Sequence, residues 1–421
     1  MTKTKIYQKI FAIVFMVMLF TFAGFNFFSV KDSVYDDITS LSEIEEFDIQ
    51  ETPKLAVSTI DNSVRTHFLG GYMWNEVYGT VFATLGKNEE NNFSYVRDKD
   101  GSQYYANFWN VPDLTMKELA VRMRRMQDDL SPSGTKVILL LYPTKYDDAW
   151  ADGYYGIPYQ DYNQYADELL RYLRRYNVDY IDYREMFKDS GLDGTQIFYN
   201  SDHHWNPESA FMATKVLVEH IREEYNDDLD PDYKYLNPEN YYFEDYKDIF
   251  MGSMGRESGE VYSGLDDCTL IIPKFDTLFD YTFYSRLGEY SQRRGPITDT
   301  LISRDPLISD DIYDRDMNSC YSGGIHVADE VVNKMPDNDI SVMFLRNSFS
   351  SPVGSFMAPM VYRLDMIWTV NSYEETNVKK LRQGNYDYVI VAVNVDNLDN
   401  DSFLFYTEPL EDAAEDTEVT E

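Results

Sequence analysis

Four short and almost purely apolar runs constrain the fold of this chain more than any other feature. They lie at residues 136–142 (KVILLLY), 340–345 (ISVMFL), 364–370 (LDMIWTV) and 386–393 (YDYVIVAV). A strand with one wet face alternates between apolar and polar residues, whereas a strand buried on both faces is apolar throughout. The four runs, with a weaker one at 178–183, therefore predict a buried and mostly parallel β-sheet.

Helical patterns alternate with these runs. Helices are expected at 114–130, 162–176, 207–224 and about 352–362, and a short hairpin is expected at 92–105. Strands that alternate with helices predict an α/β fold, a three-layer α/β/α sandwich, here over residues 66–407. Residues 225–339 lose this periodicity and are interpreted as an insertion or lid. Residues 408–421 hold seven acidic residues and no basic one, and are expected to form a disordered tail.

The N-terminus carries a membrane-targeting pattern. Three lysines (Lys3, Lys5 and Lys9) precede a run without charge at residues 10–30, and an acidic flank follows. About 20 apolar residues span a bilayer, and the lysines orient the N-terminus toward the cytoplasm. Residues 1–30 are therefore expected to be a single-pass anchor, with a cleaved signal peptide as the alternative. Residues 31–65 would be an acidic stalk, and the globular domain would lie outside the cell membrane or be secreted.

Charge and cysteine content exclude several kinds of partner. The formal net charge of −36 argues against nucleic acid, which needs a basic surface. Cys268 and Cys320 form no C-x-x-C motif, so a zinc knuckle is not expected, and the sequence leaves open whether they form a disulfide. Aromatic residues are abundant, with 36 Tyr and 25 Phe, and the cluster at 241–243 is a candidate surface for sugar rings.

Residues 201–206 (SDHHWN) carry the first candidate site. Asn206 is a suitable N-cap and Pro207 a suitable first residue for the helix that follows. In extended backbone, residues two apart point the same way, so Asp202 is expected to orient His204 as a general base while His203 points away. Asp202, His203 and His204 could instead hold the metal of a hydrolase, but adjacent histidines diverge, so no metal and no other cofactor are expected.

A nucleophile is sought at the carboxyl ends of the strands, where α/β proteins place their active sites. Ser348 follows the strand predicted at 340–345 and precedes a helix, although a serine at this position is more often a helix cap. Asn347 and Arg346 are candidates to stabilise an oxyanion, and Trp205 is expected to form a wall of the site or a plug of the core.

These motifs resemble those of the DHHW proteins, in the SGNH-hydrolase-like group that includes the alginate O-acetyltransferases of bacterial envelopes. The matching residues are Asp202, His204 and Trp205 in the first motif, and Ser348, Phe349 and Ser350 in the second. Residues 136–145 (KVILLLYPTK) and 251–255 (MGSMG) are also similar to segments of that family.

The resemblance implies a Ser348–His204–Asp202 triad that transfers acetyl groups to a surface polysaccharide, or hydrolyses them as an esterase. A membrane-bound O-acyltransferase is the implied acetyl donor. This chain has Arg346-Asn347 where the relatives have Gly followed by Asp or Thr. A non-catalytic carbohydrate-binding or scaffold protein of a polysaccharide-modification complex is therefore the alternative function.

Overall fold

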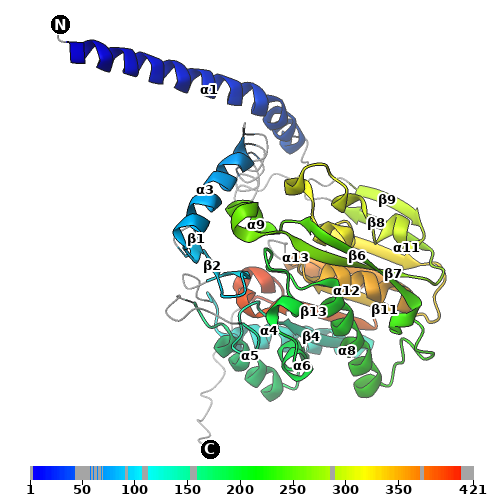
Figure 1. The fold of residues 1–421 in the computed structure, drawn as a ribbon. Coiled ribbons are helices and arrows are strands. Elements are labelled where there is room, and N and C mark those ends of the chain that lie inside the picture. The colour runs from blue at the N-terminus through cyan, green and yellow to red at the C-terminus, as the bar shows by residue number, and fades with distance from the viewer. Residues whose placement is uncertain are drawn as a thin grey trace, which may run out of the picture.

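The structure is a computed structural model that describes residues 3–42, 70–90, 93–106, 112–151, 159–284, 290–369 and 374–408, with four single positions between 57 and 68. An eight-stranded mixed sheet lies at its centre (Figure 1). Its strands follow the spatial order β5 (Asp179–Asp182), β4 (Lys136–Tyr142), β13 (Tyr388–Asn394), β11 (Ser341–Arg346), β12 (Arg363–Trp368), β10 (Ala328–Asn333), β8 (Phe279–Tyr284) and β9 (Tyr290–Gly295). Most of the expected stalk, and the expected tail beyond residue 408, lie outside the described residues.

The five strands predicted from apolar runs form the parallel half of this sheet, which confirms that part of the prediction. Their side chains alternate between two cores, as the period of a strand requires. In β4, Ile138 and Leu140 belong to one core, and Leu139 and Leu141 to the other. Both faces of the strand are therefore shielded from solvent, which explains the unbroken apolar run.

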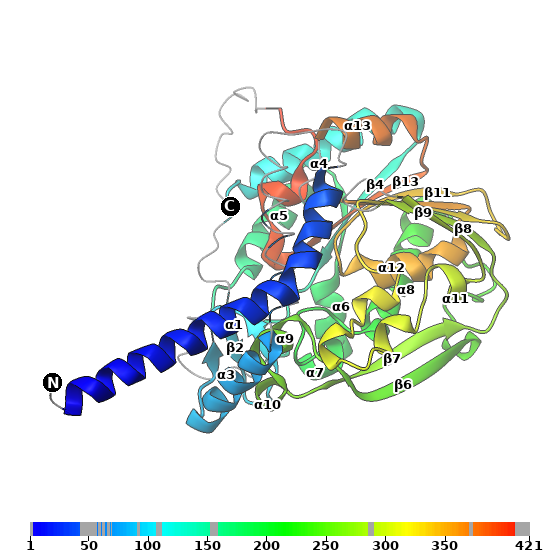
Figure 2. The ribbon, with the colours of Figure 1, turned by 90° about the horizontal axis from the view of Figure 1, so that it is seen from above.

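Helices cover both faces and complete the three layers (Figure 2). One face carries α4 (Met116–Leu130), α5 (Asn163–Arg175) and α13 (Glu374–Gln383). The other carries α6 (Tyr183–Ser190), α8 (Pro207–Tyr225) and α12 (Ser350–Met357). This arrangement is the SGNH-like α/β fold that the resemblance implied.

The region expected as an insertion contributes more to the sheet than the sequence indicates. Strands β10, β8 and β9 extend the sheet beyond β12, and all three pair antiparallel, so the sheet is mixed. No apolar run marks β9, because all its residues except Gly295 are exposed. The same region also forms a separate antiparallel pair, β6 (Tyr241–Phe250) and β7 (Asp266–Pro273).

Several short elements surround the central layers. They are the small sheet of β1 (Glu89–Glu90), β2 (Tyr95–Arg97) and β3 (Gln103–Tyr105), and the helices α3 (Gly71–Leu85), α7 (Gly194–Ile197), α9 (Ser253–Ser258), α10 (Glu260–Ser263) and α11 (Ile297–Thr300). The β2–β3 pair is the hairpin predicted at 92–105. Strand β3 of this hairpin contacts the segment before the SDHHWN motif, because Gln103 N–H donates to the Asn200 carbonyl at 2.8 Å.

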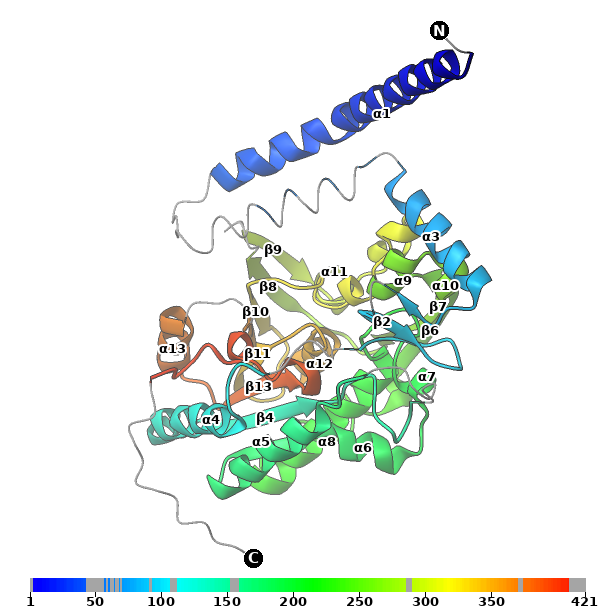
Figure 3. The ribbon, with the colours of Figure 1, turned by 90° about the vertical axis from the view of Figure 1, so that its left-hand side faces the viewer.

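The N-terminal helix α1 (Lys3–Ser42) projects from the body and continues beyond the expected end of the anchor (Figure 3). Within it, the 29 residues Tyr7–Tyr35 are long and apolar enough to cross a membrane. Most of their large apolar side chains are exposed to solvent, for example Phe11 and Phe20. The segment therefore has the properties of an anchor or a signal sequence, and not those of a core helix.

Candidate active site

The segment at residues 201–206 is held rigidly in front of α8. Asn206 caps the helix as predicted, and its side-chain oxygen accepts from Ser209 N–H at 2.9 Å. Lys145 Nζ, just beyond the end of β4, donates to the carbonyls of Asn200 at 2.8 Å and Asp202 at 3.0 Å. These bonds fix the backbone on both sides of Ser201.

Two further partners of Ser201 come from the region beyond α8. The carboxylate of Asp266 accepts from Ser201 N–H at 2.8 Å, and Ser201 Oγ accepts from Gly252 N–H at 2.8 Å. A Cβ atom added to Gly252 would lie only 2.3 Å from Asp202 Cβ. The glycine is therefore required by close packing against the motif, which explains the MGSMG sequence at this point.

Asp202 and His204 form a buried pair. Asp202 Oδ1 lies 2.6 Å from His204 Nδ1 and also accepts from His204 N–H, while Oδ2 accepts from Ser253 N–H at 2.7 Å. Burial alone would raise the pKa of Asp202, but its electrostatic interactions with the imidazoles of His204 and His203 and these hydrogen bonds hold the pKa well below its ordinary range. Asp202 is therefore a carboxylate that accepts the Nδ1 proton and orients the ring.

The other ring nitrogen of His204 is available for chemistry. Nε2 is buried and has no hydrogen-bond partner in the described part of the chain. With the proton on Nδ1, Nε2 carries the lone pair that a general base needs. Buried nitrogens are normally satisfied, so an orphan one at the end of an Asp–His pair points to a substrate site.

The turn between β11 and α12, which carries Ser348, packs against this pair through Phe349. Phe349 packs its ring 4.9 Å from that of His204, and its carbonyl accepts from Trp205 Nε1 at 3.0 Å. The fold therefore brings together two motifs that are far apart in the sequence. Ser348 Oγ itself makes no hydrogen bond to His204 Nε2, since that nitrogen has no partner among the described residues.

The turn also offers backbone donors. The N–H groups of Ser350 and Ser351 are used within the turn, bonding the carbonyls of Asn347 and Ser348. No hydrogen bond among the described residues uses the N–H groups of Ser348 and Phe349. Two such free N–H groups beside a serine hydroxyl are suited to bind a developing oxyanion.

The two residues ahead of Ser348 have other partners than those expected from the sequence. Arg346 is fully buried and pairs with Asp329 at 2.5 Å, while its Nη1 donates to Ser351 Oγ at 3.0 Å. Asn347 Nδ2 donates to Asn394 Oδ1 at 2.5 Å. These contacts give no support to an oxyanion role for Arg346 or for the Asn347 amide, and they describe residues that hold the strand ends together.

Trp205 and His203 are both placed by packing. Trp205 is buried in the core, with its indole 4.7 Å from the Tyr142 ring, and its Nε1 donates to the Phe349 carbonyl. The expectation that His203 points away from His204 is wrong, because the centroids of the two rings lie 3.9 Å apart, with the rings tilted by 38°. The backbone at 201–204 is bent and not extended, so the two-residue period of a strand does not apply there.

Asn318 is a member of the site that the sequence did not reveal. Its side-chain nitrogen lies 2.6 Å from His204 Nδ1, and its own backbone N–H is held by Asp316 Oδ1 at 3.1 Å. It comes from the region expected to be a lid. No motif surrounds it, so only the folded structure could identify it.

A small cavity opens beside the candidate site. Its lining comes from the β3 strand, the ends of β4 and β13, and both motifs, and comprises Tyr104, Tyr105, Thr144, Lys145, His203, Phe349 and Asp396. Burial lowers the pKa of Lys145 to about 8, although nearby carboxylates oppose this shift. The cavity confirms that polar groups gather at the carboxyl ends of the parallel strands.

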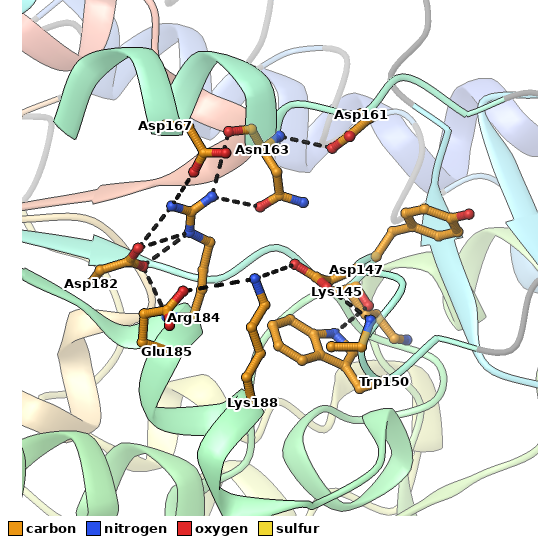
Figure 4. A network of polar contacts seen from close by, with 12 residues as sticks. Lys145, Asp147, Trp150, Asp161, Asn163, Asp167, Asp182, Arg184, Glu185 and Lys188 are labelled. Atoms are coloured by element: carbon orange, nitrogen blue, oxygen red, sulfur yellow. Dashed lines mark hydrogen bonds and ion pairs between the residues drawn. The ribbon is translucent and has the colours of Figure 1, made fainter. Parts of the chain in front are cut away.

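A polar network supports the loop that carries Lys145 (Figure 4). Trp150 Nε1 donates to the Lys145 carbonyl at 3.2 Å, and Lys188 pairs with Asp147 at 3.6 Å. At the start of α6, the buried Arg184 pairs with Asp182 at 2.8 Å and with Asp167 in α5 at 2.7 Å. Lys188 thereby connects α6 to the loop after β4, and Arg184 connects it to α5.

Asp202, His203 and His204 are also the described residues that could hold a metal ion, because one ligand atom from each lies within 4.8 Å of the others. The oxygens of Asp202 already accept three N–H bonds, from His204 and Ser253. A metal would have to displace the bond that orients His204. The donor set therefore fits an Asp–His pair better than a metal centre.

Two other predicted features lie away from the pair. In the aromatic cluster at 241–243, Tyr241 is buried and Tyr242 and Phe243 are exposed, and none of the three lines the cavity beside the site. Cys268 and Cys320 are buried and free.

The comparisons with known proteins agree with this geometry. Residues 107–247 match the family described as "SGNH hydrolase-like domain, acetyltransferase AlgX". The matched stretch contains Asp202 and His204 and ends before Ser348. A comparison with curated proteins finds no match.

Solved structures of similar fold include Bacillus cereus PatB1 with a sulfonyl adduct, at 15% identity and a TM-score of 0.57, with 74% of this chain and 98% of that one covered. A DHHW family protein from Eubacterium siraeum is 16% identical, with a TM-score of 0.50 and coverage of 72% and 90%. At these identities the likeness establishes the fold alone. The chain thus has an SGNH-hydrolase-like α/β fold, and its resemblance to the AlgX-type and DHHW proteins is confirmed.

Proposed function

We propose that this protein is an extracytoplasmic O-acetyltransferase that modifies a cell-surface polysaccharide. The observation that carries the proposal is the buried Asp202–His204 pair, whose Nε2 has no partner among the described residues and whose imidazole packs on Phe349, the residue after Ser348. The family match over residues 107–247 to an acetyltransferase domain supports the same class of reaction.

The reaction would proceed in two acyl transfers. His204 Nε2 takes the proton of Ser348 Oγ as that oxygen bonds the carbonyl carbon of the acetyl donor. The tetrahedral intermediate expels the donor's leaving group, which receives the proton from His204. A sugar hydroxyl then gives its proton to His204, attacks the acetyl carbon and releases Ser348, which recovers its proton.

The other groups of the site would stabilise the charges that develop during the reaction. Asp202 stabilises the imidazolium form of His204, and the free N–H groups of Ser348 and Phe349 receive the oxyanion. Water as acceptor would make the same site an acetylesterase, so exclusion of water decides between the two outcomes.

The helix Tyr7–Tyr35 supports a location at the cell membrane, with α1 retained as a single-pass anchor and the globular domain outside. The acetyl donor in this proposal is a membrane-bound O-acyltransferase, as the family resemblance implies. The acceptor is a polysaccharide. The strongly acidic surface agrees with a partner that is not nucleic acid.

The test uses the full chain in detergent with p-nitrophenyl acetate as donor. We expect release of p-nitrophenol and an acetyl adduct by intact mass, both lost in Ser348→Ala and retained in Ser350→Ala. Ser350 is a matched control because it lies in the same turn and hydrogen bonds Tyr142, 3.2 Å away. An adduct that persists in Ser348→Ala would refute the nucleophile.

Added oligosaccharide separates the alternatives. Acetylated sugar in the product indicates a transferase, and acetate alone indicates an esterase. A wild-type protein that neither labels nor turns over would favour the non-catalytic scaffold. Loss of activity with a chelator would favour a metal-dependent hydrolase.

A further inference from the structure

The helix α3 presents an apolar face that no described residue covers. The side chains of this face are between 39% and 65% exposed, and they are Met73, Trp74, Val77, Tyr78, Val81 and Leu85. Their spacing of three and four residues places them along one side of the helix. Soluble proteins rarely expose a continuous apolar strip of this kind unless it binds something.

The opposite face of α3 packs against α9 and α10 (Figure 3). Asn75 Nδ2 donates to the Arg256 carbonyl at 2.8 Å, and Glu76 Oε1 accepts from Glu260 N–H at 2.7 Å. A Cβ atom on Gly79 would come within 1.7 Å of the Ser258 carbonyl oxygen, so the helix packs on α9 at backbone contact. The helix cannot turn its apolar side inward without breaking these contacts.

The exposed strip carries no charge. Within Gly71–Leu85, Glu76 is the sole acidic residue and there is no Lys or Arg. Glu76 is occupied on the inner face, where it also accepts from the Tyr313 hydroxyl. A surface without basic residues, on a chain of net charge −36, is not built to attract anionic headgroups.

The position of α3 in the chain indicates what covers it. The membrane-spanning candidate lies in α1, which ends at Ser42, and residues 43–70 join it to α3. That connection reaches at most roughly 100 Å when fully extended, so a retained anchor keeps α3 close to the bilayer at high effective concentration. Trp74 and Tyr78 are the residue types that favour the boundary between lipid and water.

We propose that the outer face of α3 lies in the interfacial region of the bilayer that holds α1, bound by apolar and aromatic contact and not by charge. The proposal rests on retention of the anchor and not on acetyl transfer. Because α3 packs on α9, and Ser253 at the start of α9 donates to Asp202, the candidate active site is held at the membrane surface. An acetyl donor delivered from the membrane would meet the site there.

The experiment places the full chain in nanodiscs of neutral phosphatidylcholine, with or without bromine on the acyl chains. Bromine quenches indole fluorescence at contact. The contribution of Trp74 is obtained by subtracting the fluorescence of Trp74→Phe from that of wild type. We expect brominated lipid to remove most of this emission. Quenching should be lost in Val77→Asp/Val81→Asp and kept in Ile308→Asp, a control at an exposed apolar residue elsewhere on the surface.

Each other outcome overturns the proposal. Equal quenching in wild type and Trp74→Phe would mean that Trp74 does not touch lipid. If wild-type discs hold two copies of the protein and discs with Val77→Asp/Val81→Asp hold one, the face binds a second copy of the protein and not lipid. Intact mass of the protein in the discs shows whether the anchor is present, and the assay does not depend on enzymatic activity.

Discussion

Asn318 and His204 are 114 residues apart in sequence and in contact in the fold, with the Asn318 side-chain amide 2.6 Å from His204 Nδ1. Asp202 Oδ1 lies at the same distance from that nitrogen. Because Nδ1 carries one proton and Asp202 accepts it, we assign the Asn318 amide with its oxygen toward Nδ1. Two oxygens then share one N–H, and a residue of the expected lid helps to hold the proposed base.

Substituting Asn318 should lower turnover without changing substrate affinity. Asn318→Leu removes the second oxygen, and we expect kcat for p-nitrophenyl acetate to fall about tenfold, equivalent to about 1.4 kcal/mol, with KM unchanged. Asn318→Asp keeps an oxygen but adds negative charge beside the ring. This variant should move the acidic limb of the pH profile to higher pH.

The control for Asn318 is Ser319→Ala, the adjacent residue, whose hydroxyl bonds Asp316 and not His204. A purely structural role would reduce the folded fraction of Asn318→Asp and leave its pH profile in place. That result would contradict the positioning role.

Gly252→Ala should be among the most damaging small substitutions in the chain. The added methyl group would lie 2.3 Å from Asp202 Cβ, so either the motif or the MGSMG segment has to move. We expect a loss of about 1–3 kcal/mol in the free energy of unfolding and loss of the acetyl adduct. Ser253→Ala is the matched control, because it keeps the backbone N–H that binds Asp202. Wild-type activity in Gly252→Ala would show that the close contact is not needed.

The buried pair of Arg346 and Asp329 should matter for stability and not for chemistry. Arg346→Met leaves the Asp329 carboxylate buried without its guanidinium partner, although Tyr281 and His326 still contact it, and we expect the free energy of unfolding to fall by about 3 kcal/mol. Replacing both residues, as Arg346→Met/Asp329→Leu, should recover much of this loss. Activity per folded molecule would stay near that of wild type. A specific drop in kcat in the stable double variant would restore the oxyanion role for Arg346.

His203 should make the protein less stable in acid. Burial, followed by the charge of His204, lowers the pKa of His203 to about 3, below the ordinary value of about 6.5. Between these values the unfolded state binds the extra proton, so the free energy of unfolding falls as pH drops from 6.5, by at most about 1.4 kcal/mol per unit. Melting temperatures from pH 7 to pH 5 should therefore fall less in His203→Gln than in wild type.

His220 gives a control of opposite sign. Its hydrogen bond to Asp179 raises its pKa, so its contribution to stability is complete at low pH and disappears as pH rises through that pKa. His220→Gln should thus cost more stability at pH 5 than at pH 8.

Identical pH dependence in wild type and His203→Gln would contradict the prediction for His203, because it would show that His203 is not held neutral in the fold.

Much of the fold could be predicted because its signals are local. The run KVILLLY is apolar at every position because helices cover both faces of β4, and the structure reproduces its bounds. The start of α8 at Pro207 follows from the side chain of Asn206, one residue away. Strand β9 was not predicted, because it is an exposed edge strand and its sequence has no apolar pattern.

The candidate site divides in the same way. Asp202 and His204 are two residues apart, so the sequence brings the carboxylate close to the imidazole, but the bend at 201–204 sets the geometry of their hydrogen bond. The packing of Phe349 on His204, the contact of His204 with Asn318 and the pairing of Arg346 with Asp329 each join residues from separate elements. Only packing in three dimensions decides such contacts, because no local pattern records which distant side chain fills the space beside an imidazole or a guanidinium.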